Sequence, residues 1–322
     1  MALVTVILTT LNSERFVVRS IESCLNQTHQ NLELLIVDGG SQDRTLEILG
    51  SYNDTRIRII HQEDNTGKLP GALNLGMAHA RGEFITWAQD DSWYELNAIE
   101  TMLEYLNSHP DVGLVYCDYW DVDEAGNPLR YQKVHPPEDI LVDDVIRQCF
   151  LFRREVYDTI GPQDTKYHPV HEVPWRIRVA NAFKIQPLHV PLMYYGLHPG
   201  SLTGRIGGWQ LQRMMADALL QEGHLDNAAY NLRIAQFDID QAYDEYILQG
   251  NYRAFWRYAL SGIWRNWRNL GNRGLWKLML MSLSPVRDKY RNALFSNWLE
   301  ADNIHQQNLV EQYAQESQNV QE

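Results

Sequence analysis

The sequence has few cysteines and no long apolar runs. Its three cysteines, Cys24, Cys117 and Cys149, are widely spaced among 322 residues. An odd number at such spacing forms neither a disulfide framework nor a C-x-x-C metal site, and it suits a reducing compartment. No run of eighteen apolar residues is present, so no segment is predicted to span a bilayer. The first residues lack the features of a secretory signal, and we therefore expect a cytoplasmic protein.

Proline is almost absent from the last third of the chain. Eleven of the twelve prolines lie at or before Pro199, and the other is Pro285. Because proline interrupts helices, this distribution predicts a mixed α/β region followed by a helical one, with the boundary near residues 204–208. We accordingly divide the sequence into an α/β domain at 1–205 and a helical region at 206–322.

Apolar β-branched runs alternate with amphipathic segments in the first region. Residues 4–8, 32–37 and 84–87 resemble strands, and helical patterns lie at 13–26 and 42–49. Such alternation predicts an α/β fold with a mostly parallel central sheet. A dehydrogenase of this class would need G-x-G-x-x-G after its first strand, and a nucleotidyltransferase would need a glycine-rich phosphate loop there. The sequence TTLNSE is neither, so both classes are disfavoured.

Polar residues follow three of the predicted strands. Thr9, Thr10 and Asn12 come after the first, residues 38–43 after the second, and residues 89–91 after the strand at 84–87. Because ligands bind beyond the carboxyl ends of parallel strands, we expect these clusters to share one rim of the sheet. Each cluster alone also has a structural explanation, since Asp and Ser form turns and cap helices.

Together the clusters resemble the family-2 inverting glycosyltransferases, over about residues 3–204. The resemblance implies a GT-A fold and a hexosyltransferase that moves a sugar from a nucleotide diphosphate donor to a hydroxyl of a glycan or lipid-linked acceptor, by metal-assisted single displacement. It also implies a role in cell-envelope polysaccharide synthesis, and no nucleic acid is expected as a partner. The residues that carry it are VTVILTTLN (4–12), SIESCLNQTHQNLELLIVDGGSQDRTLEIL (20–49), EDNTGKLPGALNLGMAHARGEFITWAQDD (63–91), FRREVYDTIGP (152–162) and HEVPWRIRV (171–179).

The same resemblance implies roles for individual residues. Asp38 would accept a hydrogen bond from the base, and Asp90 would contact ribose or metal. Asp91 would bind Mn²⁺ or Mg²⁺, hard cations that prefer oxygen ligands. Lys68 would meet the diphosphate as a point charge, although a solvated surface lysine is the simpler reading. The nucleotide-sugar-binding residues implied are Thr9, Thr10, Asn12, Asp38, Lys68, Asp90 and His198.

An inverting transfer needs a general base on the face opposite the leaving group. The resemblance implies Glu172 as this catalytic residue, since it lies six residues before Arg178, where most relatives have Asp. His171 is the alternative base, because the unperturbed pKa of histidine is near 6.5. Ala88 stands where many relatives have a further acid. The second reading is therefore a GT-A-like subunit that binds a nucleotide sugar without transferring it.

The segment 251–292 differs in charge from the rest of the chain. It holds nine Lys and Arg residues against one acid, in a chain of formal charge −13. Apolar residues flanked by arginines are typical of a helix in a membrane interface, which predicts peripheral contact with anionic lipid at the cytoplasmic face. The alternative is that the apolar stripe packs on the catalytic domain. The stripe comprises Trp256, Leu260, Ile263, Trp264, Trp267 and Leu270, with Arg253, Arg257, Arg265 and Arg268 beside it.

Overall fold

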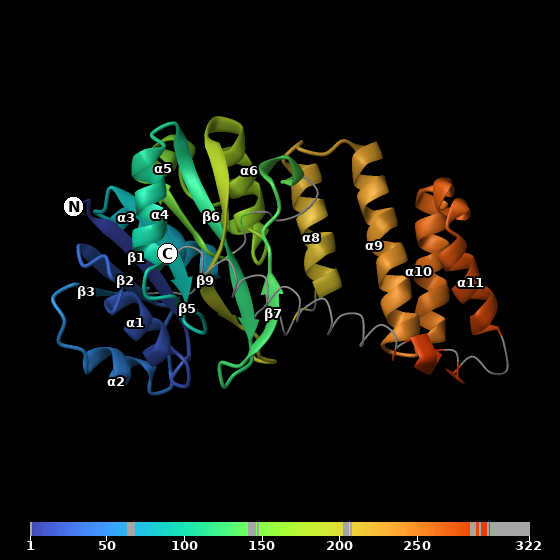
Figure 1. Ribbon diagram of the computed structural model, residues 1–322, viewed down its shortest axis with the longest axis horizontal. Helices are drawn as coiled ribbons and strands as arrows, with labels where there is room; N and C mark the ends of the chain where they lie inside the picture. Colours follow the sequence, from blue (N-terminus) through green and yellow to red (C-terminus); the bar gives the residue numbers. More distant parts are fainter. Residues whose placement is uncertain are drawn as a thin grey trace, which may run out of the picture. The chain divides into compact units, whose positions relative to one another are not determined.

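The chain folds into two compact units, Met1–Arg205 and Ile206–Glu322, which we call unit 1 and unit 2 (Figure 1). The structure does not describe residues 204, 205 and 207 of the predicted boundary at 204–208. The first part of the run at 63–91 also lies outside the described residues. The computed structural model describes residues 2–62, 68–140, 146, 148–201, 206, 208–283, 288–289, 291–294 and 296.

Unit 1 is built on one sheet. The strand order is β3-β2-β1-β4-β8-β6-β9-β5, and β7 pairs with β6. The first four strands in this order run parallel, β6 runs parallel to β9, and β5, β7 and β8 run antiparallel to their neighbours. The predicted α/β class with a mostly parallel sheet is confirmed. The strands are β1 (Val4–Thr10), β2 (Leu32–Asp38), β3 (Ile57–His61), β4 (Phe84–Gln89), β5 (Trp93–Tyr94), β6 (Val112–Val122), β7 (Pro128–Gln132), β8 (Phe150–Arg153) and β9 (Lys184–Gly196).

Two hydrophobic cores lie on the two faces of this sheet. Along β1, Val6 and Leu8 belong to one core and Ile7 to the other, as the two-residue period of a strand requires. Helices α1 and α4 complete the first core, and α3, α5 and α6 complete the second. The helices of unit 1 are α1 (Val17–Leu25), α2 (Thr45–Gly50), α3 (Lys68–His79), α4 (Ala98–Ser108), α5 (Arg154–Ile160) and α6 (Glu172–Ala182), with 3-10 turns η2 (Pro137–Asp139) and η3 (Thr165–Tyr167).

All the regular secondary structure in the described residues of unit 2 is helical. Asp226, Asn251 and Asn272 each precede a helix, and each side chain accepts a hydrogen bond from the backbone N–H three residues later. These are the residue types that cap helix N-termini, so the sequence itself sets the helix starts. No described helix is long and apolar enough to cross a membrane. The helices are α8 (Gly208–Gln221), α9 (Asn227–Ile247), α10 (Tyr252–Arg265) and α11 (Arg273–Ser282), with the 3-10 turn η4 (Trp267–Gly271).

Candidate active site

The loops that follow β1, β2 and β4 lie at one end of the sheet, because these strands are parallel neighbours. Thr10 pairs with Asp38 in the register of β1 and β2, and Thr9 pairs with Gln89 between β1 and β4. The structure thus brings the three polar clusters to one rim. This rim is at the carboxyl ends of the strands, where α/β sheets bind ligands.

Asn12 connects the first of these loops to the second. Its backbone N–H donates to Ser41 Oγ at 2.9 Å, and its side-chain oxygen accepts from the backbone N–H of Gln42 at 2.7 Å. Asn12 has a φ of 53°, in the left-handed region that asparagine tolerates better than most residues. Its side-chain oxygen therefore positions the rim, and Thr9 and Thr10 are buried at the end of β1.

Asp38 is buried at the end of β2. Its Oδ2 accepts from the backbone N–H of Gly40 at 3.0 Å, and its Oδ1 accepts from that of Ser41 at 3.2 Å. His61 Nδ1 lies 3.7 Å from the same carboxylate. Each carboxylate oxygen has two acceptor sites, so Asp38 fixes the turn at 38–41 and keeps acceptor capacity at the rim.

Asp90 and Asp91 follow β4 and contact different parts of the chain. Asp90 Oδ2 accepts from the backbone N–H of Leu11 at 3.2 Å, which joins the β4 turn to the β1 loop. Asp91 Oδ1 accepts from Ser92 Oγ at 3.0 Å, and its Oδ2 lies 3.2 Å from His198 Nε2. His198 lies just beyond β9, so this contact brings together residues 107 positions apart.

The surroundings of both carboxylates disfavour negative charge. Burial, and then the charge of Asp91, raises the pKa of Asp90 to about 6. Burial also raises the pKa of Asp91, although Ser92 and His198 oppose the rise. A cation at this point would relieve the excess negative charge.

The Asp91–His198 pair fits a divalent metal. The two side chains are 13% and 14% exposed, so an ion from solvent could reach both. Carboxylate oxygen suits Mn²⁺ and Mg²⁺, and an imidazole partner favours the transition metal, Mn²⁺. Within the described residues no group of three or more His, Cys, Asp or Glu side chains could hold a metal. Water or a bound diphosphate could supply further ligands.

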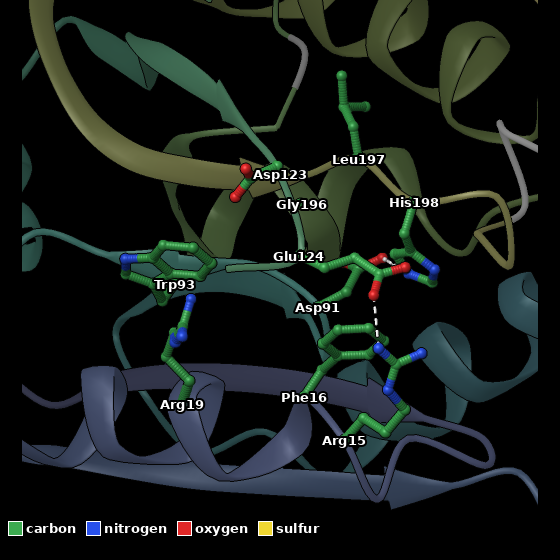
Figure 2. Close-up of a pocket in the computed structure, with 10 residues that line it drawn as sticks. All are labelled: Arg15, Phe16, Arg19, Asp91, Trp93, Asp123, Glu124, Gly196, Leu197 and His198. Carbon is green, nitrogen blue, oxygen red and sulfur yellow. Dashed lines mark hydrogen bonds and ion pairs between the residues drawn. The ribbon is translucent and has the colours of Figure 1, made fainter. Parts of the chain in front are cut away.

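A pocket opens beside the Asp91–His198 pair (Figure 2). Its walls come from the start of α1, from β5, from the turn after β6 and from the end of β9. Arg15 makes an ion pair with Glu124 at 2.5 Å, and the Phe16 ring centroid is 4.6 Å from that of His198. The lining residues are Arg15, Phe16, Arg19, Asp91, Trp93, Asp123, Glu124, Gly196, Leu197 and His198.

Sequence reasoning did not single out the two arginines of this pocket. The Arg19 guanidinium lies 4.4 Å from the centre of the Trp93 ring, and that ring also stacks on Tyr194 at 5.4 Å. Trp93 is therefore engaged in packing. One feature of the sequence could have pointed to Arg15 and Arg19. Both lie at the start of the first helix, directly after the polar loop at the rim.

Glu172 begins α6 and makes an ion pair with Arg176. The carboxylate and guanidinium are 2.8 Å apart, and the Arg176 side chain is only 1% exposed. The guanidinium also lies 5.7 Å from the ring centre of Phe150. Because the buried guanidinium needs a negative partner, Glu172 contributes to folding as well as to any chemistry. Sequence spacing pointed to Arg178, whereas Arg178 donates to the Pro162 carbonyl at 3.2 Å.

His171 and Lys68 lie in contrasting environments. His171 is buried, and burial, with smaller effects from His168 and Arg176, lowers its pKa to about 3. A histidine with so low a pKa is a poor base near neutral pH, which favours Glu172 over His171. Lys68 is exposed at the start of α3, as expected for a solvated surface lysine.

Gly196 allows the end of β9 to approach Asp91 closely. A Cβ at this position would lie 2.2 Å from the Asp91 carbonyl oxygen, which is backbone and cannot move alone. We expect Gly196→Ala to displace the Asp91–His198 pair, to lower the free energy of unfolding by about 2 kcal/mol or more, and to impair activity. The control is Gly50→Ala, because its Cβ meets no atom within 4 Å. Denaturant unfolding of both variants checks this, and equal stability of the two would contradict it.

Comparisons with known proteins agree with this geometry. The family model "Glycosyl transferase family 2" matches residues 5–161. Glycosyltransferase GlyG of Streptococcus pneumoniae is 36% identical over 132 residues, which are 40% of this chain and 43% of that protein. The putative glycosyltransferase EpsH of Bacillus subtilis is 38% identical over 221 residues, 63% of each chain. The match thus spans less than half the length of the first relative and less than two thirds of the second.

Solved structures share the fold at low sequence identity. Staphylococcus aureus TarS 1-349 in complex with UDP-GlcNAc matches with a TM-score of 0.58 at 16% identity, over 81% of each chain. The mannosyltransferase PcManGT from Pyrobaculum calidifontis in complex with GDP-Man and Mn²⁺ matches with a TM-score of 0.57 at 16% identity, over 94% of this chain and 86% of that one. The polar rim, the family match over 5–161 and this fold agree, and the chain belongs to the family-2 glycosyltransferases.

Proposed function

We propose that this glycosyltransferase is an inverting hexosyltransferase that uses a nucleotide diphosphate sugar and transfers the sugar to a hydroxyl of a glycan or lipid-linked acceptor. The observation that carries the proposal is the Asp91–His198 contact at the rim, a partly buried pair whose surroundings favour a divalent cation. Proteins of the same fold hold UDP-GlcNAc, or GDP-Man with Mn²⁺, which supports a nucleotide-sugar donor.

The proposed mechanism assigns each step to residues of this chain. Asp91 and His198 would hold Mn²⁺ or Mg²⁺, which supplies positive charge against the departing diphosphate. Asp38 and the backbone beside Thr9 would hold the nucleoside, and Asp90 would contact the ribose while it fixes the loop at Leu11.

The acceptor side of the mechanism depends on Glu172. This carboxylate would take the proton from the acceptor hydroxyl as the hydroxyl oxygen attacks the anomeric carbon from the face opposite the leaving group. The Arg176 guanidinium, 2.8 Å away, would keep Glu172 oriented and ionised for this task.

The acceptor class bears on where the protein works. A lipid-linked acceptor for cell-envelope polysaccharide would be met at a membrane surface. The basic segment 251–292 would then bring the enzyme to the cytoplasmic face as a peripheral protein.

A second candidate function rests on two features of the site. Ala88, where many relatives have a further acid, is buried in the core, and Glu172 is already engaged by a buried arginine. A domain of this kind could bind a nucleotide sugar without transferring it. Incubation of purified protein with a labelled nucleotide sugar separates the two, because only the transferase releases nucleotide diphosphate.

We expect Mn²⁺ and the matching nucleotide diphosphate to stabilise the protein together. A ligand at a hundred times its Kd adds about 2.7 kcal/mol to the free energy of unfolding, so Tm should rise by several degrees. The measurement is thermal unfolding of the protein in the presence of UDP, GDP or another nucleotide diphosphate. Each nucleotide is tested with Mn²⁺ and with excess chelator. His198→Ala should lose the metal-dependent part of the shift. A shift of equal size in chelator would contradict metal-assisted binding.

A further inference from the structure

Helix α10 of unit 2 has two distinct sides. Phe255 and Ala259 pack into the core of the unit, against residues of α9. Gly262 lies so close to α9 that a Cβ would be 2.6 Å from Ile239 Cδ1, which fixes the side that faces inward. On the other side Leu260 is exposed, and Trp264 is 82% exposed. The stripe predicted from the sequence is therefore divided, because Trp256 and Ile263 pack against the core instead.

Exposed apolar residues continue beyond α10. Trp267 in η4 is 72% exposed, and on α11 Leu280 is 70% exposed, whereas Leu275 and Leu278 of α11 are buried in the shared core. Helix α10 lies beside α9, and α11 lies beside α10 (Figure 1). Both helices thus bury one set of apolar side chains in the core that they share with α9 and expose another set. Leu270 belongs to η4, but its side chain is outside the part of the chain that the structure describes. We call the exposed set the Trp–Leu face: Leu260, Trp264, Trp267, Trp276, Leu280 and Leu283.

Cations accompany the Trp–Leu face without any acid in the same stretch of chain. Arg253, Arg257, Arg268 and Lys277 are exposed, and no Asp or Glu occurs between Glu245 and Asp288. The prediction that Arg265 also flanks the stripe is wrong. Arg265 turns inward, where its Nε lies 3.5 Å from buried Asp238 and its Nη1 donates to Asn231 at 2.9 Å.

This combination fits one kind of partner. Positive side chains that have no acids near them in the sequence are attracted to an anionic surface. Exposed Trp and Leu side chains are stabilised by a partner with an apolar interior that can bury them. An anionic lipid bilayer offers both in the same plane. A second copy of the chain bound through the same face would bring like charges together, which disfavours that contact.

We propose that the Trp–Leu face with Arg253, Arg257, Arg268 and Lys277 docks unit 2 onto an anionic membrane, with the tryptophans at headgroup depth. The tryptophans and leucines of this face would be the residues that insert. The link between membrane binding and a lipid-borne acceptor rests on the proposed function. Binding itself requires neither donor nor metal, so it is measured separately from catalysis.

The test is co-sedimentation of the full chain with phosphatidylcholine vesicles, prepared with and without phosphatidylglycerol. We expect binding to the anionic vesicles that weakens as salt rises. Trp264→Ser with Trp267→Ser should reduce binding by about tenfold or more. Arg253→Gln with Arg257→Gln should reduce it by about tenfold at low salt and by less at high salt. Circular dichroism and thermal unfolding of each variant verify the fold.

The matched control is Arg44→Gln with Arg81→Gln, which removes the same charge from exposed positions in unit 1. It should bind like the parent protein. No binding by the parent, or equal binding by the control and the Arg253/Arg257 variant, would overturn the proposal. Lipid-independent dimers that Trp264→Ser dissolves would also overturn it and assign the face to a second copy. Failure of sugar transfer with vesicle binding intact would count against the proposed function alone.

Discussion

Asp91→Asn is expected to abolish sugar transfer while the protein stays folded. The variant keeps the shape of the side chain, including an oxygen that can accept from Ser92 Oγ, but it removes the negative charge beside His198. If the metal supplies about 4 kcal/mol of transition-state stabilisation, the rate should fall by about a thousandfold. The measurement is release of nucleotide diphosphate and transfer of labelled sugar at saturating Mn²⁺.

The thermal stability of this variant should stay the same or rise although its activity falls. Burial raises the pKa of Asp91, so the metal-free protein bears a cost for its charge near neutral pH, and a neutral amide removes that cost. Asp91→Asn should therefore melt at the same temperature as the parent or higher, but lose the additional stabilisation by Mn²⁺ and nucleotide. Asp111→Asn is the control, because this exposed acid pairs with Lys184 at 2.8 Å in a different part of unit 1. Near-normal transfer by Asp91→Asn would remove the basis of the metal assignment.

The rim was predictable from the sequence because strand alternation determines it. Once residues 4–8, 32–37 and 84–87 are taken as neighbouring parallel strands, the residues after them must meet at one end of the sheet. The predicted fold class is confirmed on the same grounds. The Asp91–His198 contact was accessible only through the family resemblance, since it joins residues 107 positions apart through the register of β9.

Local charge contacts were harder to anticipate, for different reasons. The pairing of Glu172 with Arg176 follows the i, i+4 geometry of a helix, and the sequence contained that signal. The spacing to Arg178 drew attention away from it. The inward turn of Arg265 had no local signal, because its partner Asp238 belongs to another helix. A helical period marks which residues share a side, but packing between helices decides which side is buried.

Glu172→Gln is expected to lower the rate of sugar transfer by about a hundredfold or more while donor binding persists. The amide cannot take the proton from the acceptor hydroxyl, but it leaves the nucleotide contacts unchanged. The same change removes the negative partner of buried Arg176, which could lower the free energy of unfolding by about 3 kcal/mol. Donor binding, thermal stability and transfer must therefore be measured on the same preparation.

A double variant separates the catalytic role of Glu172 from its structural one. Glu172→Gln with Arg176→Met removes both charges, and replacing a buried ion pair by neutral groups is often close to neutral for stability. If Glu172 is the base, the double variant folds, binds donor and remains inactive. If the carboxylate only balances Arg176, the double variant recovers transfer. Glu172→Asp retains a carboxylate like that of most relatives, so it should keep measurable activity, whereas His171→Ala should keep most of it because His171 is buried and neutral. If His171→Ala loses most sugar transfer while the double variant is folded and active, His171 and not Glu172 is the general base.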